Sequence, residues 1–149
     1  MVQTYSNNNK IYSVDMMFAY INIYKPKSQK VYIKTLLHNL EHKGWSGGTP
    51  NKSDRYSPLD VINNPKKYKN EIERINKANL KYPIIVYNNY VIDGVHRLTK
   101  SMLTNKKTIK VYTFTSELMK KFLINSSGNW NKVDRMQTYD FIKLFYERF

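Results

Sequence analysis

The chain has 149 residues, 41% of them hydrophobic, which is enough to bury a core without covalent cross-links. It contains no cysteine, which excludes disulfides, thiolate nucleophiles and cysteine-ligated zinc. Its 25 lysine and arginine residues outnumber its 11 aspartate and glutamate residues, and the resulting net charge of +14 attracts polyanions such as nucleic acid and nucleotides.

The positive charge has a second explanation, because lysine, asparagine, isoleucine and tyrosine are the residues that A+T-rich genes encode most often. Such a bias suits a large DNA virus, a plasmid or a low-GC bacterium. The sequence has no apolar run long enough to cross a membrane and no signal-peptide core. We therefore expect an intracellular protein, cytoplasmic or viral, that does not bind membranes, and we leave its oligomeric state open.

The N-terminal third is predicted to contain one strand and two helices. Residues 1–10 are polar and are expected to fray. A short strand ends at Val14 and leads into a helix capped by Ser13 or Asp15. Residues 31–43 are predicted to form the second helix, and its inner face carries Val31, Leu36, Leu37 and Leu40.

Two histidines of this second helix, His38 and His42, are four residues apart. That spacing places both on one helix face and can bind zinc, although a solvated helix face is the simpler interpretation.

Residues 45–56 are predicted to form a long glycine-containing loop. Lys52 and Arg55 would allow this loop to close as a lid over a phosphate, and a disordered basic loop is the alternative. A helix is then predicted to begin at Ser57-Pro58 and to break at 63–65. The next predicted helix spans residues 66–78, and its inner face carries Tyr68, Ile72 and Ile75.

The centre of the chain predicts a hairpin followed by a helix. Residues 84–86 and 90–92 are apolar, and the Asn88-Asn89 pair between them tolerates positive φ. Asp93-Gly94-Val95-His96-Arg97 then turns into a helix that begins near Arg97 and ends by residue 104.

The last part of the chain predicts a strand over residues 107–114 and helices over 116–124 and 134–149. The predicted fold class is therefore α+β. We expect a main domain over residues 1–114 and a C-terminal helical extension over residues 115–149 packed on it.

The turn around Gly94 predicts an anion site, because free backbone N–H groups and the positive end of the helix dipole converge there. Arg97 can grip two phosphate oxygens, and His96 can donate to a phosphate or move a proton. The alternative is a structural turn with a surface arginine and a satisfied histidine. The residues expected to bind the ligand are Asp93, Gly94, His96, Arg97, Thr99 and Lys100.

The order of hairpin, Asp-Gly-x-His-Arg and helix resembles the core of the ParB/sulfiredoxin superfamily, most closely its small serine kinases. The similarity covers residues 56–114. It implies a small mixed sheet in which the hairpin is followed by a phosphate-binding helix. It also implies that His96, Arg97 and the helix start bind the phosphates of ATP or another nucleotide, with Mg²⁺ as a companion ion.

Val95 departs from the family pattern. It replaces the catalytic cysteine of the sulfiredoxins, which excludes sulfinic-acid reduction, and the acidic residue of ParB. ParB also needs a helix-turn-helix domain after its nucleotide domain, and the residues after 114 are too few for that and a dimerisation domain, so we expect no operator reading. A kinase of this type needs a carboxylate that activates the acceptor hydroxyl. Asp15, Asp54, Asp60 and Glu71 are the candidates, each with a surface or N-cap role as its alternative.

The function we expect is binding of a nucleotide, followed by phosphoryl transfer or nucleotide hydrolysis in which Asp15 and His96 are the catalytic residues. The first alternative is a noncatalytic, basic nucleic-acid-binding protein of a virion or nucleoid. The second is a nuclease, which the scattered acidic residues favour least.

Overall fold

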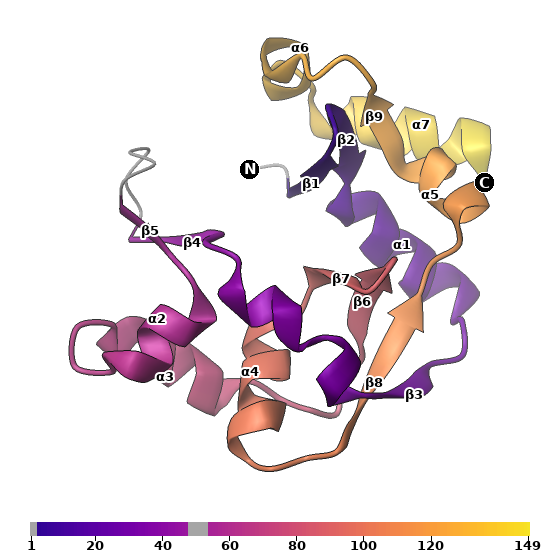
Figure 1. The fold of residues 1–149 in the computed structure, drawn as a ribbon. Coiled ribbons are helices and arrows are strands. Elements are labelled where there is room, and N and C mark those ends of the chain that lie inside the picture. The colour runs from indigo at the N-terminus through magenta and orange to yellow at the C-terminus, as the bar shows by residue number, and fades with distance from the viewer. Residues whose placement is uncertain (1–2, 48–53) are drawn as a thin grey trace. The chain divides into compact units, whose positions relative to one another are not determined.

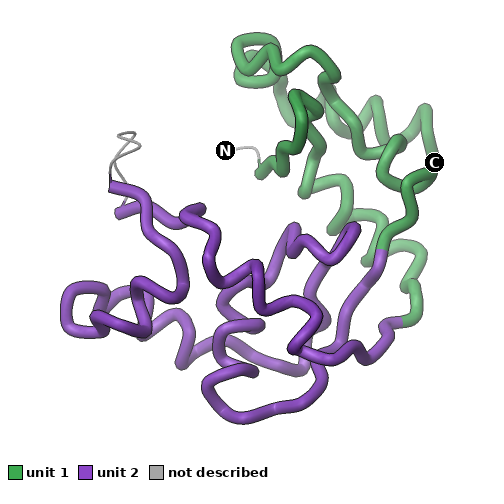
Figure 2. The backbone as a smooth tube through the Cα atoms, in the orientation of Figure 1, with its two compact units in different colours: residues 1–27, 114–149 green, residues 28–113 purple. Residues whose placement is uncertain are grey.

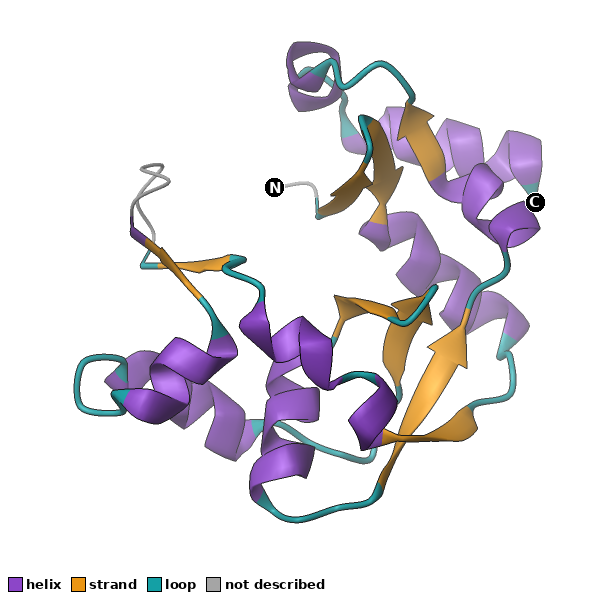
Figure 3. Cartoon of the chain, viewed as in Figure 1, coloured by secondary structure: helices purple, strands orange, loops and turns teal. Residues whose placement is uncertain are grey.

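Two units, built from different parts of the chain, make up the computed structural model, which describes residues 3–47 and 54–149. Unit 1 combines residues 1–27 with residues 114–149, and unit 2 is residues 28–113 (Figure 2). Both contain short strands and helices, so the fold class is α+β, as predicted (Figures 1 and 3). The sequence analysis divided the chain once, after residue 114; in the structure the first 27 residues group instead with the C-terminal segment.

Unit 1 is held together by a small antiparallel sheet that joins the two ends of the chain. Strand β1 (Thr4–Asn7) pairs with β2 (Lys10–Ser13), and β2 pairs with β9 (Leu123–Asn125). The expectation that residues 1–10 fray is therefore wrong for residues 4–10, and residues 1 and 2 lie outside the described residues. Asn8 and Asn9 adopt positive φ and close a two-residue hairpin, a signal that the sequence analysis used only at Asn88-Asn89.

Unit 1 also contains several helices. Helix α1 (Val14–Tyr24) is capped by the Ser13 side chain, as predicted. Helix α5 (Ser116–Phe122) ends where β9 begins, so the predicted helix over 116–124 is too long. The predicted helix over 134–149 is observed as α7 (Thr138–Arg148), which begins later because Gln137 and Asp140 form a capping box. A separate helix that was not predicted, α6 (Trp130–Asp134), precedes it.

Unit 2 contains a four-stranded mixed sheet in the order β3-β8-β6-β7. Strand β6 (Ile84–Tyr87) runs parallel to β8 (Thr108–Thr113) and antiparallel to β7 (Tyr90–Asp93). Strand β3 (Gln29–Tyr32) pairs antiparallel with β8 at the sheet edge. Helix α4 (Val95–Leu103) connects β7 to β8 (Figure 1).

The predicted helix over residues 31–43 is wrong. Its first residues belong to β3, because pairing with β8 satisfies their backbone groups. The remainder forms two short 3₁₀ helices, η1 (Ile33–Thr35) and η2 (Leu37–Glu41). Leu36 and Leu40 are buried as expected, whereas Leu37 is 39% exposed.

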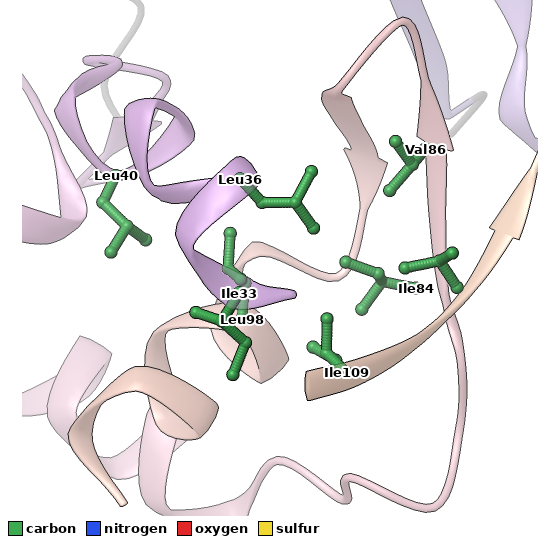
Figure 4. Packing of buried hydrophobic residues seen from close by; sticks show 8 residues of the cluster. Ile33, Leu36, Leu40, Ile84, Val86, Leu98 and Ile109 are labelled. Atoms are coloured by element: carbon green, nitrogen blue, oxygen red, sulfur yellow. The ribbon is translucent and has the colours of Figure 1, made fainter. Parts of the chain in front are cut away.

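The main core of unit 2 lies between the sheet, α4 and the 3₁₀ segment. Figure 4 shows side chains from these three sources pointing toward one another. Leu98 of α4 and Ile84 of β6 are fully buried there. The cluster consists of Ile33, Leu36, Leu40, Ile84, Val86, Leu98, Ile109 and Val111.

A second, smaller core supports the segment before the hairpin. The two-residue strands β4 (Trp45–Ser46) and β5 (Arg55–Tyr56) pair with each other, and helices α2 (Pro58–Asn63) and α3 (Lys69–Lys77) follow. The capping box of Ser57 and Asp60 starts α2, as the Ser-Pro signal predicted. The buried members of this core are Tyr56, Val61 and Ile75, with Trp45, Tyr68 and Ile72 packed against them.

Candidate anion-binding site

The junction between β7 and α4 has the geometry that the sequence predicted. Asn88 and Asn89 close the hairpin with φ values of 49° and 62°. Helix α4 begins at Val95, two residues before Arg97. Gly94 precedes it with φ of 110°, a conformation that favours glycine.

Gly94 has no substitute at this position, because a Cβ atom built on it would lie 2.8 Å from Cβ of Ile84 and closer still to Cγ2 of the same residue. As the N-cap of α4, it also brings no side-chain acceptor, and no side chain in the described chain caps the helix. The first backbone N–H groups of α4 are therefore left to an external acceptor.

A pocket of about 400 Å³ opens at this helix start. It lies between the end of α3 and the β7–α4 turn, and Tyr82, 59% exposed, forms part of its wall. Arg74 and Lys77 enter it from the last turn of α3. The lining residues are Arg74, Lys77, Ala78, Asn79, Tyr82, Asp93, Gly94, His96 and Arg97.

Arg97 is bound to the protein rather than free. Its Nη2 donates to Oδ2 of Asp93 at 2.7 Å, and its Nη1 donates to the backbone oxygens of Tyr82 at 3.1 Å and Pro83 at 2.9 Å. The side chain is only 18% exposed. The predicted two-oxygen grip on a phosphate would have to displace these contacts, so Arg97 acts here as a clamp between the hairpin and the segment before β6.

Lys100 and Thr99 are engaged in the same way. The Nζ atom of Lys100 donates to the backbone oxygens of Asn76 at 2.8 Å and Ala78 at 2.7 Å, which ties α4 to the end of α3. Thr99 is fully buried, and its hydroxyl donates to the Val95 oxygen at 2.7 Å. The two residues do not line the pocket but stabilise the helix beside it. The sequence analysis expected them to contact the ligand.

The exposed cations that line the pocket are Arg74 and Lys77, which the sequence analysis did not select. The Arg74 side chain is 68% exposed, and its Nη1 also lies 3.3 Å from Oε1 of Glu71. Basic residues in the last turn of a helix are common because they complement the helix dipole, so the sequence carried no special signal for them.

His96 is held by a buried carboxylate. Its Nε2 lies 2.7 Å from Oε2 of Glu71, a residue only 5% exposed. The imidazole stacks on the Trp45 indole, with ring centroids 4.4 Å apart and planes inclined by 16°. Of the four candidate carboxylates, Glu71 is therefore the one that the structure places beside the imidazole of the motif.

The Glu71 carboxylate has a further neighbour, the Tyr56 hydroxyl, which donates to its Oε1 at 3.3 Å. Burial, and then the adjacent charge of Glu71, raise the pKa of Tyr56 above its ordinary value. Tyr56 therefore stays protonated and remains a donor, which keeps the second oxygen of Glu71 satisfied.

The other candidate carboxylates lie elsewhere. Asp15 belongs to α1 in unit 1, where it accepts from the backbone N–H of Gln3 at 3.0 Å. Asp60 caps α2, and the hydrogen bonds from Ser57 lower the pKa of its carboxyl. Asp54 is exposed next to β5 and lines a different hollow. Asp60 is thus the third helical residue of the capping box, whose N-cap is Ser57, and its observed role is to stabilise the start of α2.

The zinc spacing at His38 and His42 rests on an α-helix that is absent from this part of the described chain, where η2 is a 3₁₀ helix. Residues i and i+4 do not share a face in that geometry. His38 instead meets the Tyr90 ring edge-on, with centroids 5.5 Å apart. Within residues 3–47 and 54–149, no three His, Cys, Asp or Glu side chains form a group that could hold a metal ion.

The predicted lid is only partly visible. Arg55 lies in β5 and is exposed, whereas Lys52 falls outside the described residues.

Among the helices that the structure describes, none has both the length and the apolar character that a bilayer span requires. Comparisons with protein-family models, with curated proteins and with solved structures found no match for this chain.

Proposed function

We propose that the pocket at the start of α4 binds the phosphate groups of a nucleotide, and that unit 2 is a divergent member of the ParB/sulfiredoxin-like superfamily. The proposal rests on one observation: the uncapped N-terminus of α4 and two exposed cations, Arg74 and Lys77, line the same pocket. Three cationic side chains and one carboxylate line it, and that carboxylate, Asp93, is already paired with Arg97. An anion entering the pocket therefore meets a net positive surface.

The superfamily assignment is supported by the local order of elements. An antiparallel hairpin leads through Asp93-Gly94-Val95-His96-Arg97 into a helix, and that helix packs against a mixed sheet. In this reading Arg97 keeps its place in the motif but positions the phosphate-binding turn, and Arg74 and Lys77 supply the charge that contacts the ligand.

The site also supports proton transfer. A buried carboxylate 2.7 Å from one nitrogen of the imidazole fixes the ring, which orients His96 to exchange a proton with a bound phosphate. We propose that His96 is the catalytic residue of a phosphoryl-transfer or hydrolysis step, and that Glu71 positions it. Asp15, the base expected from the sequence, is replaced in this proposal by Glu71 and His96. Mg²⁺ remains the companion ion expected with the nucleotide.

Isothermal titration calorimetry tests the binding proposal. The full chain is titrated with ATP, ADP, CTP and GTP, each with and without Mg²⁺. The double substitution Arg74→Gln and Lys77→Gln should weaken binding by about tenfold or more, because two charge-assisted contacts to the phosphates are lost. Lys110→Gln, which removes an exposed charge from β8, should leave the affinity unchanged.

If none of the nucleotides binds the wild-type protein, or if the double variant binds as well as the wild type, the pocket is not a nucleotide site. The noncatalytic nucleic-acid-binding function then takes its place. The net charge of +14 favours that second candidate, and its signature would be an affinity for DNA that falls steeply with salt.

A further inference from the structure

Unit 1 contains an open groove of about 980 Å³ that the proposed nucleotide site does not use. Helices α1, α6 and α7 contribute its lining. The floor is apolar, with Met16 and Phe141 buried. A groove of this size and character is suited to covering by another apolar surface rather than by water.

Helix α7 presents an exposed apolar stripe along one wall of this groove. Tyr139, Ile142 and Tyr146 are 72%, 62% and 86% exposed. Their spacing of three and four residues puts them on one face of the helix, and Lys143 shares that face. Trp130 of α6, 43% exposed, lies at the same groove.

The charged residues that line the groove are acidic, although the chain as a whole is basic. The two ionisable acids that line the groove are Asp15 and Asp134, and no lysine or arginine lines it. Within residues 3–47 and 54–149, Asp134 and Lys143 form no ion pair. The surface thus offers an unpaired carboxylate in the groove and an unpaired cation on the adjacent stripe.

We propose that two copies of this chain pair through the surface formed by α7 and the groove, with the α7 stripe of each copy covering the groove of the other. A two-fold interface brings one patch against itself, so the patch must be self-complementary. This one is, because it carries an apolar stripe, a groove to receive it, and opposite charges at Asp134 in the groove and Lys143 on the stripe. Lys143 of each copy then faces Asp134 of the other.

In a two-fold dimer every substitution is present on both sides of the interface, so its effect on the dimer Kd is larger than that of a single substitution. Sedimentation equilibrium of the full chain over a range of concentrations measures the monomer–dimer equilibrium. The wild-type protein should form a closed dimer. Ile142→Asp should raise the dimer Kd by about a hundredfold, because it buries a carboxylate in each apolar contact. Ile142 is mostly exposed, so the folded monomer should survive, which circular dichroism checks.

Charge reversal tests the pairing itself. Lys143→Glu alone and Asp134→Lys alone should each raise the dimer Kd by about tenfold, because two attractive contacts become two repulsive ones. The double variant Asp134→Lys and Lys143→Glu restores opposite charges and should return the Kd to near the wild-type value. Lys10→Glu, an equal charge change at an exposed residue of unit 1 away from the groove lining, should have no effect.

A wild-type chain that stays monomeric at every concentration would overturn the proposal, as would open-ended assembly, because a two-fold interface closes on itself. If Ile142→Asp left the dimer Kd unchanged, the interface would lie elsewhere. A double variant weaker than either single variant would show that Lys143 and Asp134 do not face each other.

Discussion

The Arg97 side chain is 18% exposed, and its guanidinium is hydrogen-bonded within unit 2. The sequence placed it in an anion site because a guanidinium matches phosphate geometry. In the structure three acceptors already occupy it: the Asp93 carboxylate and the backbone oxygens of Tyr82 and Pro83. These groups are separated from Arg97 by 4 to 15 residues, and their convergence depends on the hairpin.

Arg97→Ala should therefore destabilise the fold. We expect the free energy of unfolding to fall by about 2 kcal/mol, because partly buried acceptors lose a charged donor. Arg97→Lys should recover only part of this loss, since one ammonium cannot reproduce the fork. Urea denaturation measures both. Arg74→Ala, at an exposed arginine, is the comparison and should cost less than about 1 kcal/mol. Equal losses at the two positions would mean that the clamp contributes nothing.

Tyr56 reports on the charge of Glu71. Burial is the larger cause of its raised pKa and Glu71 the next, so Glu71→Gln should bring the Tyr56 pKa partway back toward its ordinary value of 10.0. The tyrosine Cζ resonance, assigned with Tyr56→Phe, follows the titration. A Tyr56 pKa that is unchanged in Glu71→Gln would mean that the carboxylate is not ionised beside the phenol.

The same shift has a consequence for stability. A phenol with a higher pKa in the folded state than in the unfolded state stabilises the fold fully below the unfolded pKa, here about pH 10. This contribution is lost as the pH rises through the folded-state pKa. The alkaline unfolding of Tyr56→Phe should accordingly begin at higher pH than that of the wild type.

At the scale of elements, the start of α4 depends on Gly94. Gly94→Ala should destabilise the protein by about 3 kcal/mol, because the new methyl group meets Ile84 and the backbone holds a φ of 110°. Gly47→Ala is the matched control: its Cβ would meet no described atom within 4 Å and its φ is ordinary, so the stability should change by less than about 0.5 kcal/mol. Thermal unfolding of the two variants compares them directly, and similar transition temperatures would refute the requirement for glycine.

Elements with a local chemical signal were predictable. The Asn88-Asn89 turn, the Ser13 cap and the Ser57-Pro58 start were all confirmed, because turn and cap preferences act within four residues. The missed strands β3 and β9 have a common cause. Strand β3 exists because β8 lies beside it, and β9 exists because β2 does. A strand whose pairing partner lies more than 70 residues away cannot be identified from the local sequence pattern.

In the candidate site, too, the features set by neighbouring residues were predictable and those set by distant residues were not. The turn at Gly94 and the uncapped start of α4 follow from five consecutive residues. The Glu71–His96 contact joins positions 25 apart, so the sequence offered Glu71 only as one of four acids. Arg74 and Lys77 look like ordinary residues at a helix end, and only the pocket identifies them.

At the scale of the whole molecule, the net charge of +14 predicts an attraction for nucleic acid whether or not the pocket binds a nucleotide. The affinity for DNA and the affinity for a nucleotide should depend differently on the salt concentration. Affinity for DNA, spread over many lysines, should fall by orders of magnitude between low and moderate salt, whereas a nucleotide held by a few close contacts should lose far less. Fluorescence anisotropy with labelled DNA and labelled ATP measures both across a salt series; parallel losses would indicate one shared, nonspecific surface.

The claim that an anion binds at the start of α4 can be tested at the atoms concerned. Amide resonances of the ¹⁵N-labelled full chain are followed during titration with inorganic phosphate and then with ATP, at moderate salt. The largest shifts should fall on the backbone N–H groups of Val95, His96 and Arg97, because these donors have no acceptor within the helix. Saturating shifts at these three residues would agree with the account. Shifts spread over the lysine-rich surface, with these three amides unmoved, would contradict it.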